Sequence, residues 1–121
     1  MKNILIIDDD PDIVELLKIR LEADDFIVTA ASDGVTGLIK AKIQTPDLVI
    51  LDIGMPHIDG IRFIKEAKHI PEIKKIPILV LTGHSDKKEF LKHEGIEHYI
   101  VKPYQANELL DLIKSILLNP R

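Results

Sequence analysis

The sequence predicts an α/β domain in which helices cover both faces of a five-stranded parallel sheet. Short apolar runs alternate with longer amphipathic segments five times along the 121 residues, and this alternation is typical of a parallel sheet. The central apolar runs are hydrophobic throughout rather than at every second residue, as expected for strands covered on both sides. Right-handed crossovers then make a doubly wound sheet the simplest arrangement.

The composition is that of one ordinary globular domain. Hydrophobic residues make up 45% of the chain and charged residues 30%. The formal net charge is -4 and no basic face stands out, which disfavours binding to nucleic acid. The sequence has no cysteine, so disulfides and thiolate metal sites are excluded. The first apolar run is short and is followed by three acids, so it predicts neither a signal peptide nor a membrane span.

The first unit begins with the apolar run Ile4–Ile7, which predicts a strand that ends at Asp8. Asp10 is suited to cap a helix, and Pro11 is suited to the first helical position. The predicted helix has one apolar face, formed by Ile13, Val14, Leu17 and Leu21.

The second and third units follow the same order. Phe26–Ala31 predicts a strand, and Asp33 is expected to cap the helix after it. The pattern of this helix is less regular and consists of Val35, Leu38, Ile39 and Lys42. Asp47–Leu51 predicts the third strand, and Asp59 with Gly60 predicts a turn that opens a third helix.

The last two units complete the sheet. Ile76–Thr82 predicts the fourth strand, and Asp86–His93 predicts a short helix that ends at Gly95. His98–Lys102 predicts the fifth strand, and the last helix follows Pro103. The apolar stripe of this helix consists of Leu109, Leu112, Ile113, Ile116 and Leu117.

Polar side chains stand at the ends of four of the five predicted strands. They are Asp8 and Asp9 after the first strand, Asp52 after the third, Thr82 at the end of the fourth and Lys102 at the end of the fifth. In an open α/β sheet, ligands bind beyond the carboxyl ends of the strands. We therefore expect these five side chains to form one site.

The residue types at this edge are suited to phosphoryl chemistry. Three carboxylates close together repel one another unless a cation is present, and Mg²⁺ prefers carboxylate, water and phosphate oxygens. Lys102 adds a positive charge and Thr82 a hydroxyl group, both of which suit a phosphoryl group. Asp52 lies on the central strand, and carboxylates can accept a phosphoryl group as an aspartyl phosphate.

With these residues in place, the chain resembles the receiver domain of two-component response regulators, as in the chemotaxis receivers. The matching parts are the acidic pair Asp8 and Asp9, "LDIGMPHIDG" around Asp52, "LTG" with Thr82, and "HYIVKPY" with Tyr99 and Lys102. The resemblance implies a single receiver domain over residues 1–121. It also implies a flavodoxin-like sheet with the strand order 2-1-3-4-5.

The resemblance implies a role for each site residue. Asp52 is the expected phosphoacceptor and one of the metal ligands. Asp9 is the expected direct ligand of Mg²⁺, or of another divalent cation such as Mn²⁺, and Asp8 holds a metal-bound water. The carbonyl of Gly54 is a further expected ligand, and Lys102 contacts the phosphoryl oxygens.

The resemblance also implies a switch. Thr82 turns toward the phosphoryl group, and Tyr99 rotates inward behind it. The bond between Lys102 and Pro103 is expected to be cis. The output face then consists of the fourth helix, the fifth strand and the fifth helix, and it would allow a homodimer.

The implied partners are proteins. A sensor histidine kinase or a histidine phosphotransfer protein would supply the phosphoryl group, and an effector that the sequence does not identify would respond. We expect no direct contact with nucleic acid or membrane, a cytoplasmic location, and no turnover of a small substrate. Whether the domain stands alone or belongs to a longer regulator stays open, because Asn119 and Pro120 suit either a stop or a linker.

Two features differ from the usual receiver pattern. Gly83 stands where alanine is usual, and glycine leaves the entry to the site open. Gly54 and His84 occupy positions that set how fast the phosphate hydrolyses in this family, so both are expected to matter.

Two alternatives use the same residues. A Mg²⁺-dependent phosphatase of the haloacid dehalogenase type also needs an aspartate nucleophile, but Gly54 stands where its acid/base aspartate would be. A pseudo-receiver that only binds partners is disfavoured by the intact set of site residues.

The spacing of the five histidines does not suit a zinc helix.

Overall fold

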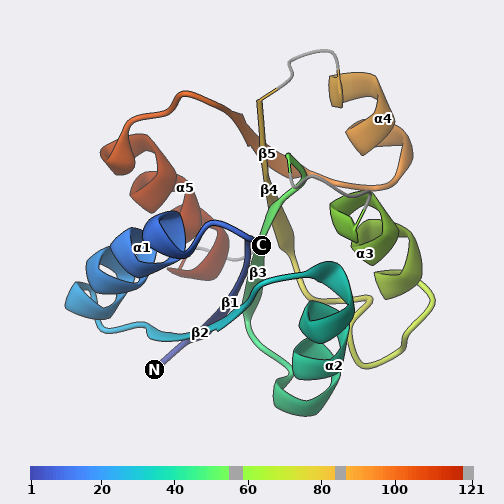
Figure 1. Cartoon of the computed structure of the whole chain (residues 1–121), viewed down its shortest axis with the longest axis horizontal. Coiled ribbons are helices and arrows are strands. Elements are labelled where there is room, and N and C mark those ends of the chain that lie inside the picture. Colours follow the sequence, from blue (N-terminus) through green and yellow to red (C-terminus); the bar gives the residue numbers. More distant parts are fainter. Residues whose placement is uncertain (55–58, 84–86, 119–121) are drawn as a thin grey trace.

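The computed structural model describes residues 1–54, 59–83 and 87–118. Within these ranges, five parallel strands form one sheet in the order β2-β1-β3-β4-β5. Helices α1 and α5 cover one face, and α2, α3 and α4 cover the other (Figure 1). The doubly wound fold and the implied strand order are therefore confirmed. The elements are β1 (Asn3–Ile7), α1 (Pro11–Ala23), β2 (Ile27–Ala31), α2 (Gly34–Gln44), β3 (Leu48–Asp52), α3 (Asp59–Ala67), β4 (Ile78–Thr82), α4 (Lys88–His93), β5 (His98–Val101) and α5 (Ala106–Leu118).

The boundaries differ from the predicted ones by one or two residues. β4 begins at Ile78 rather than Ile76. β3 includes Asp52 as its last residue, so the hydrogen-bonded ladder helps to fix the position of this side chain. α4 begins at Lys88, and the predicted start at Asp86 lies outside the described residues.

Both predicted helix caps are confirmed. The carboxylate of Asp10 accepts hydrogen bonds from the backbone N–H groups of Asp12 (3.0 Å) and Ile13 (3.4 Å). The carboxylate of Asp33 accepts one from the N–H of Thr36 at 2.7 Å, which holds the pKa of Asp33 below its usual value. Such bonds replace those that the first turn of a helix lacks. The first cap therefore fixes the start of α1 beside the carboxyl end of β1.

The hydrophobic core has two halves, one on each face of the sheet. β3 is buried at all five of its residues, as predicted for a strand covered on both sides. On one face the strands pack against α1 and α5, through Leu17, Leu21, Leu109, Ile113 and Leu117. On the other face they pack against α2, α3 and α4, through Ala41, Phe63, Ile64, Ala67 and Leu91. This packing holds the carboxyl ends of the strands in fixed relative positions.

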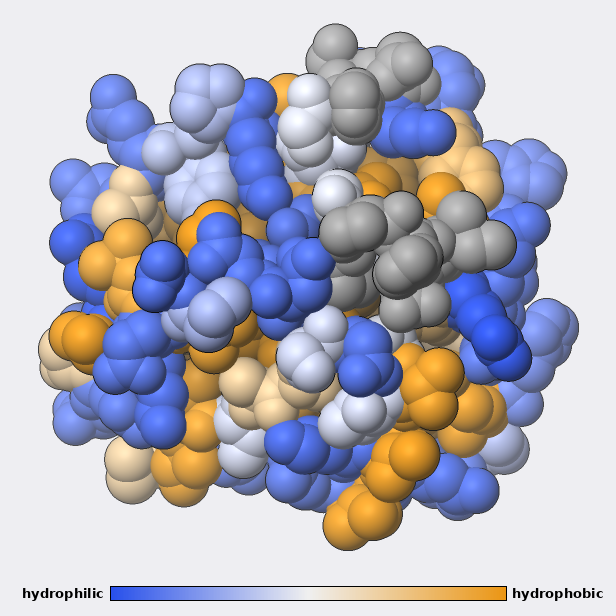
Figure 2. All heavy atoms as spheres, in the orientation of Figure 1, coloured by the Kyte–Doolittle hydropathy of each residue, from blue (hydrophilic) through white to orange (hydrophobic). Residues whose placement is uncertain are grey.

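Helix α2 buries two glycines and an alanine and exposes three of its large apolar residues. Val35, Ile39 and Ile43 are 52%, 56% and 77% exposed. Figure 2 shows a row of hydrophobic side chains over α2. The buried residues are Gly34, Gly37 and Ala41. A Cβ atom on Gly37 would lie 2.5 Å from Cδ1 of Ile7, so glycine allows the helix to approach the sheet closely. Among the described residues, no helix is long and apolar enough to cross a membrane.

Candidate functional site

The strands bring the predicted site residues to one edge of the sheet. Asp8 and Asp9 follow β1, Asp52 ends β3, Thr82 ends β4 and Lys102 follows β5. These four strands are parallel neighbours, so their carboxyl ends lie side by side. The structure therefore places all five residues where the sequence predicted them.

Three carboxylates form a cluster at this edge. Asp8, Asp9 and Asp52 each offer an oxygen, and these oxygens lie within 4.8 Å of one another. Asp8 is 2% exposed and Asp52 is 5% exposed, whereas Asp9 faces solvent. An open depression of about 430 Å³ borders Asp8 and Asp9, so a hydrated cation can reach the cluster. Because carboxylates this close repel one another, the cluster favours a bound cation.

Asp8 gives the clearest indication of a cation. Its Oδ1 atom accepts a hydrogen bond from the N–H of Asp10 at 2.9 Å, but its buried Oδ2 atom has no hydrogen-bond partner among the described residues. Burial raises the pKa of Asp8 to about 6, and repulsion from Asp52 and Asp9 adds to this, whereas the hydrogen bond from Asp10 and the charge of Lys102 oppose it. A buried polar atom without a partner is unfavourable, and a hard divalent cation with a bound water would satisfy it. The residues present therefore fit the expected Mg²⁺ ion.

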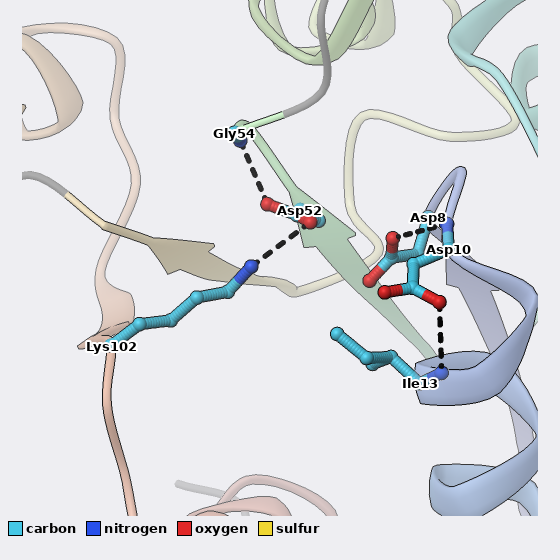
Figure 3. A network of polar contacts seen from close by, with 6 residues as sticks. All are labelled: Asp8, Asp10, Ile13, Asp52, Gly54 and Lys102. Atoms are coloured by element: carbon cyan, nitrogen blue, oxygen red, sulfur yellow. Dashed lines mark hydrogen bonds and ion pairs between the residues drawn. The ribbon is translucent and has the colours of Figure 1, made fainter.

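Both carboxylate oxygens of Asp52 have partners (Figure 3). Nζ of Lys102 lies 3.0 Å from Oδ2, and the N–H of Gly54 donates a hydrogen bond to Oδ1 at 2.7 Å. The contact with Lys102 agrees with the predicted site, whereas the N–H contact of Gly54 is an addition to its predicted role as a carbonyl ligand. A Cβ atom on Gly54 would lie 3.1 Å from Oδ1, so a larger residue would crowd the carboxylate.

The two predicted switch residues project from the same face of the sheet. Tyr99 is half-buried, packs against the core on the side of α3 and α4, and lies opposite Val80 in the β4–β5 register. Side chains alternate along a strand, so buried Thr82 projects from the same face as Val80. The bond between Lys102 and Pro103 is cis, as the resemblance implied.

The two departures from the receiver pattern have different outcomes. Gly83 is exposed, and a Cβ atom there would meet nothing within 4 Å, so the space itself does not require glycine. His84 lies outside the described residues, and its effect on phosphate lifetime stays a prediction. In the part of the chain that the structure describes, the cluster of potential metal ligands consists of aspartates and includes no histidine.

Sequence reasoning assigned no role to Tyr104, which lies close to the site. This side chain is half-buried against the core between α1 and α5. Burial raises the pKa of its phenol, and the charges of Asp8 and Asp52 add to this effect while Lys102 opposes it. The signal in the sequence was an aromatic residue two positions after Lys102, in the quoted "KPY".

Comparison with known proteins identifies the family. Residues 4–114 match the response regulator receiver domain, so the chain belongs to this family of two-component systems. Receiver domains bind Mg²⁺ at a cluster of acidic residues and take phosphoryl groups from histidine kinases.

Several proteins are similar over nearly the whole chain. The alkaline phosphatase synthesis transcriptional regulatory protein PhoP of Bacillus subtilis is 38% identical over 120 residues, which cover 96% of this chain and 48% of that protein. The chemotaxis protein CheY4 of Vibrio cholerae is 31% identical with a TM-score of 0.88, covering 97% of this chain and 99% of that one. The response regulator TrrA of Thermotoga maritima, solved in complex with Mg²⁺–BeF, is 36% identical with a TM-score of 0.85, covering 97% of this chain and 100% of that one. The chain spans about half the length of the first curated relatives that it matches.

Proposed function

We propose that this domain accepts a phosphoryl group on Asp52, in a reaction that needs Mg²⁺, from a histidine kinase or a histidine phosphotransfer protein. The observation that carries this proposal is the buried oxygen of Asp8 that has no partner among the described residues, next to the Asp52 carboxylate. A site with this arrangement is suited to bind a cation together with an anionic phosphoryl group. The similar regulator TrrA, which binds Mg²⁺ and BeF, supports the same use of the cluster here.

The proposed metal ligands come from two strand ends. The carboxylates of Asp9 and Asp52 and the carbonyl of Gly54 would bind the ion directly, and Asp8 would hold one of its waters. Mn²⁺ has the same preference for oxygen ligands and would substitute for Mg²⁺. When bound, the ion would neutralise charge on the phosphoryl oxygens.

In the proposed reaction a carboxylate oxygen of Asp52 attacks phosphorus. The new P–O bond forms as the P–N bond to the donor histidine breaks, and the leaving imidazole keeps the electron pair. Lys102 already lies 3.0 Å from Oδ2 of Asp52, which is close enough to contact the transferred group. Later attack by water would release phosphate and reset the domain.

We propose that phosphorylation changes the output face through Thr82 and Tyr99. The phosphoryl group adds about -1.5 to -2 charges at one point. The hydroxyl group of Thr82 would turn toward it, and Tyr99 would move further into the space behind Thr82. The face formed by α4, β5 and α5 would then bind an effector or a second copy of the domain.

The remaining parts of the proposal concern the protein as a whole. The domain would catalyse only its own phosphorylation and dephosphorylation, because Gly54 stands where a phosphatase would need a second aspartate. It would act in the cytoplasm, where transcriptional regulators such as its relatives meet DNA.

Intact-mass spectrometry after incubation with acetyl phosphate tests this proposal. We expect wild-type protein to gain one phosphate with Mg²⁺ and none in EDTA. Asp52→Asn should gain none, because an amide cannot form the acyl phosphate. Asp10→Asn is the matched control, since it removes a neighbouring acid but can still cap α1, and it should be phosphorylated normally.

Two results would contradict the proposal. A phosphate on Asp52→Asn would mean that another residue is the acceptor. Folded wild-type protein that gains no phosphate, either from acetyl phosphate or from a phosphorylated histidine phosphotransfer protein, would indicate a pseudo-receiver.

A further inference from the structure

A second depression lies at the opposite edge of the sheet. It has a volume of about 380 Å³, and its lining includes Ile78 and His98, the first residues of β4 and β5. Thr82 lies at the other end of β4, about 13 Å away at the usual rise of a strand. The volume is within the range of about 300–1,000 Å³ that small-molecule sites have. This depression is therefore separate from the phosphorylation site.

Isoleucines form the apolar part of the lining of the depression. One side of the depression is formed by the end of α3 and the loop after it. The other side is formed by the loop between α4 and β5. Ile64 and Ile73 are buried in the core beneath it, and Ile76 and Ile96 are half-buried at its walls. Such a surface is suited to the apolar body of a ligand.

At the rim of the depression, lysine side chains outnumber acidic side chains. Nζ of Lys68 lies 2.9 Å from the carboxylate of Glu94, whose side chain is only 7% exposed, so these two charges are already paired. The pKa of Glu94 is lowered by its hydrogen bond with Lys68 and, to a smaller extent, by its contact with His93. This acid therefore stays ionised and paired. Lys74 and Lys75 also line the depression, and neither has an ion-pair partner within the described ranges. Glu97 is the one further acid at this rim, so one cation remains in excess.

We propose that this depression binds a small amphipathic anion with a single negative charge. Its apolar body would lie against the isoleucines, and its carboxylate or similar head group would lie beside Lys74 and Lys75. A lysine ammonium group attracts such a head group as a point charge with rotatable donors. Binding here needs neither Asp52 nor Mg²⁺, so this proposal does not rest on the proposed phosphorylation.

Amide chemical-shift titration by NMR tests the proposal with a matched pair of probes. Phenylbutyrate has an apolar body and one charge, and phenylbutyramide has the same body without the charge. We expect phenylbutyrate to give saturable shifts for the backbone N–H groups of segments 73–76, 78 and 94–98. Phenylbutyramide should bind about tenfold more weakly, which is the typical effect of one charge-assisted hydrogen bond.

Matched variants show whether the two lysines are responsible. Lys74→Gln with Lys75→Gln should weaken phenylbutyrate binding about tenfold and leave phenylbutyramide binding unchanged. Lys87→Gln with Lys88→Gln is the control, because it removes the same charge from adjacent lysines outside the depression. This second variant should bind phenylbutyrate as the wild type does.

Four results would overturn the proposal: no saturable shifts, equal affinity for the two probes, shifts that map to another surface, or equal weakening by both double variants. The titrations are repeated with Asp52→Asn in EDTA. This repeat keeps a failure of the proposed ligand site distinct from a failure of the proposed phosphorylation.

Discussion

Replacement of Asp8 by asparagine should stabilise the protein at neutral pH when no divalent cation is present. Asparagine keeps an oxygen that can accept the hydrogen bond from the N–H of Asp10, now 2.9 Å long. Its NH₂ group would take the place of the Oδ2 atom, which has no partner among the described residues, and could donate to the carboxylates of Asp9 or Asp52. The change removes a buried charge, and because the two side chains have nearly the same shape, it leaves no cavity.

The size of the effect follows from the pKa of Asp8. It rises from 3.8 to about 6 in the folded protein, and one pKa unit corresponds to about 1.4 kcal/mol. Ionised Asp8 therefore destabilises the fold by at most about 3 kcal/mol. Water in the depression beside it screens part of this effect, so we expect Asp8→Asn to raise the free energy of unfolding by about 1–2 kcal/mol.

The pH dependence distinguishes this reasoning from a simple packing effect. Well below pH 3.8, Asp8 is protonated in both the folded and the unfolded protein, so its ionisation has no effect on stability. Between pH 3.8 and about 6, the unfolded chain loses this proton first, so the wild type loses stability as pH rises. The advantage of Asp8→Asn should therefore be small at the acidic end of this window and reach its full size above about pH 6.

Urea denaturation in EDTA measures the difference. The curves are recorded for wild type and Asp8→Asn at neutral pH and at about pH 4, where only part of the difference remains. Asp12→Asn serves as the control, because Asp12 is an exposed acid in the first turn of α1. Equal stability of wild type and Asp8→Asn at neutral pH would refute the reasoning, and so would a difference of the same size at both pH values.

Three further predictions concern the cation, the packing of α2 and a helix cap. Mg²⁺ at a hundredfold excess over its Kd should raise the free energy of unfolding of wild type by about 2.7 kcal/mol, as measured by urea denaturation. An equal gain in Asp9→Asn would exclude Asp9 as a ligand. Gly37→Val should destabilise the protein by about 2 kcal/mol, because its Cβ would overlap Ile7. Gly83→Val should have little effect, because its Cβ would meet nothing within 4 Å. Thermal unfolding of the two variants compares their stability. Asp33→Ala should lose about 1 kcal/mol at neutral pH. Because the cap lowers the pKa of Asp33, the part of that loss that depends on the ionised carboxylate should disappear as pH falls through the folded pKa, and a loss independent of pH would contradict this role.

The sheet and its site were predictable because both depend on local patterns. A run of apolar residues that stops at a charged residue marks a buried strand and its end, as at Asp8 and Asp52. Parallel strands then bring those ends to one edge, whatever the details of packing. The family resemblance added the strand order and the cis bond before Pro103, which no periodicity indicates.

The features that the sequence did not predict depend on distances between elements. The irregular apolar pattern of α2 included Val35 and Ile39, but the structure exposes both and buries Gly37, because the helix approaches Ile7 closely. The depression at the opposite edge depends on how two loops meet. Neither result follows from the spacing of residue types along one element.

Residue types alone also could not show whether the acid cluster forms a ligand site. The environment of its carboxylates explains why the site can respond to ligands. A charged residue after a strand is commonly a turn residue or a cap, and Asp10 is such a cap. Asp8 differs because its carboxylate is buried with one oxygen that lacks a partner in the described chain, and because other acids lie near it. These conditions destabilise the protein when the cluster is ionised and no cation is bound. A cation removes this destabilisation, so the free energy that the fold loses without a cation becomes available for binding one. The same residues that weaken the edge of the sheet therefore make it a strong candidate for a site where a cation and a phosphoryl group alter the structure.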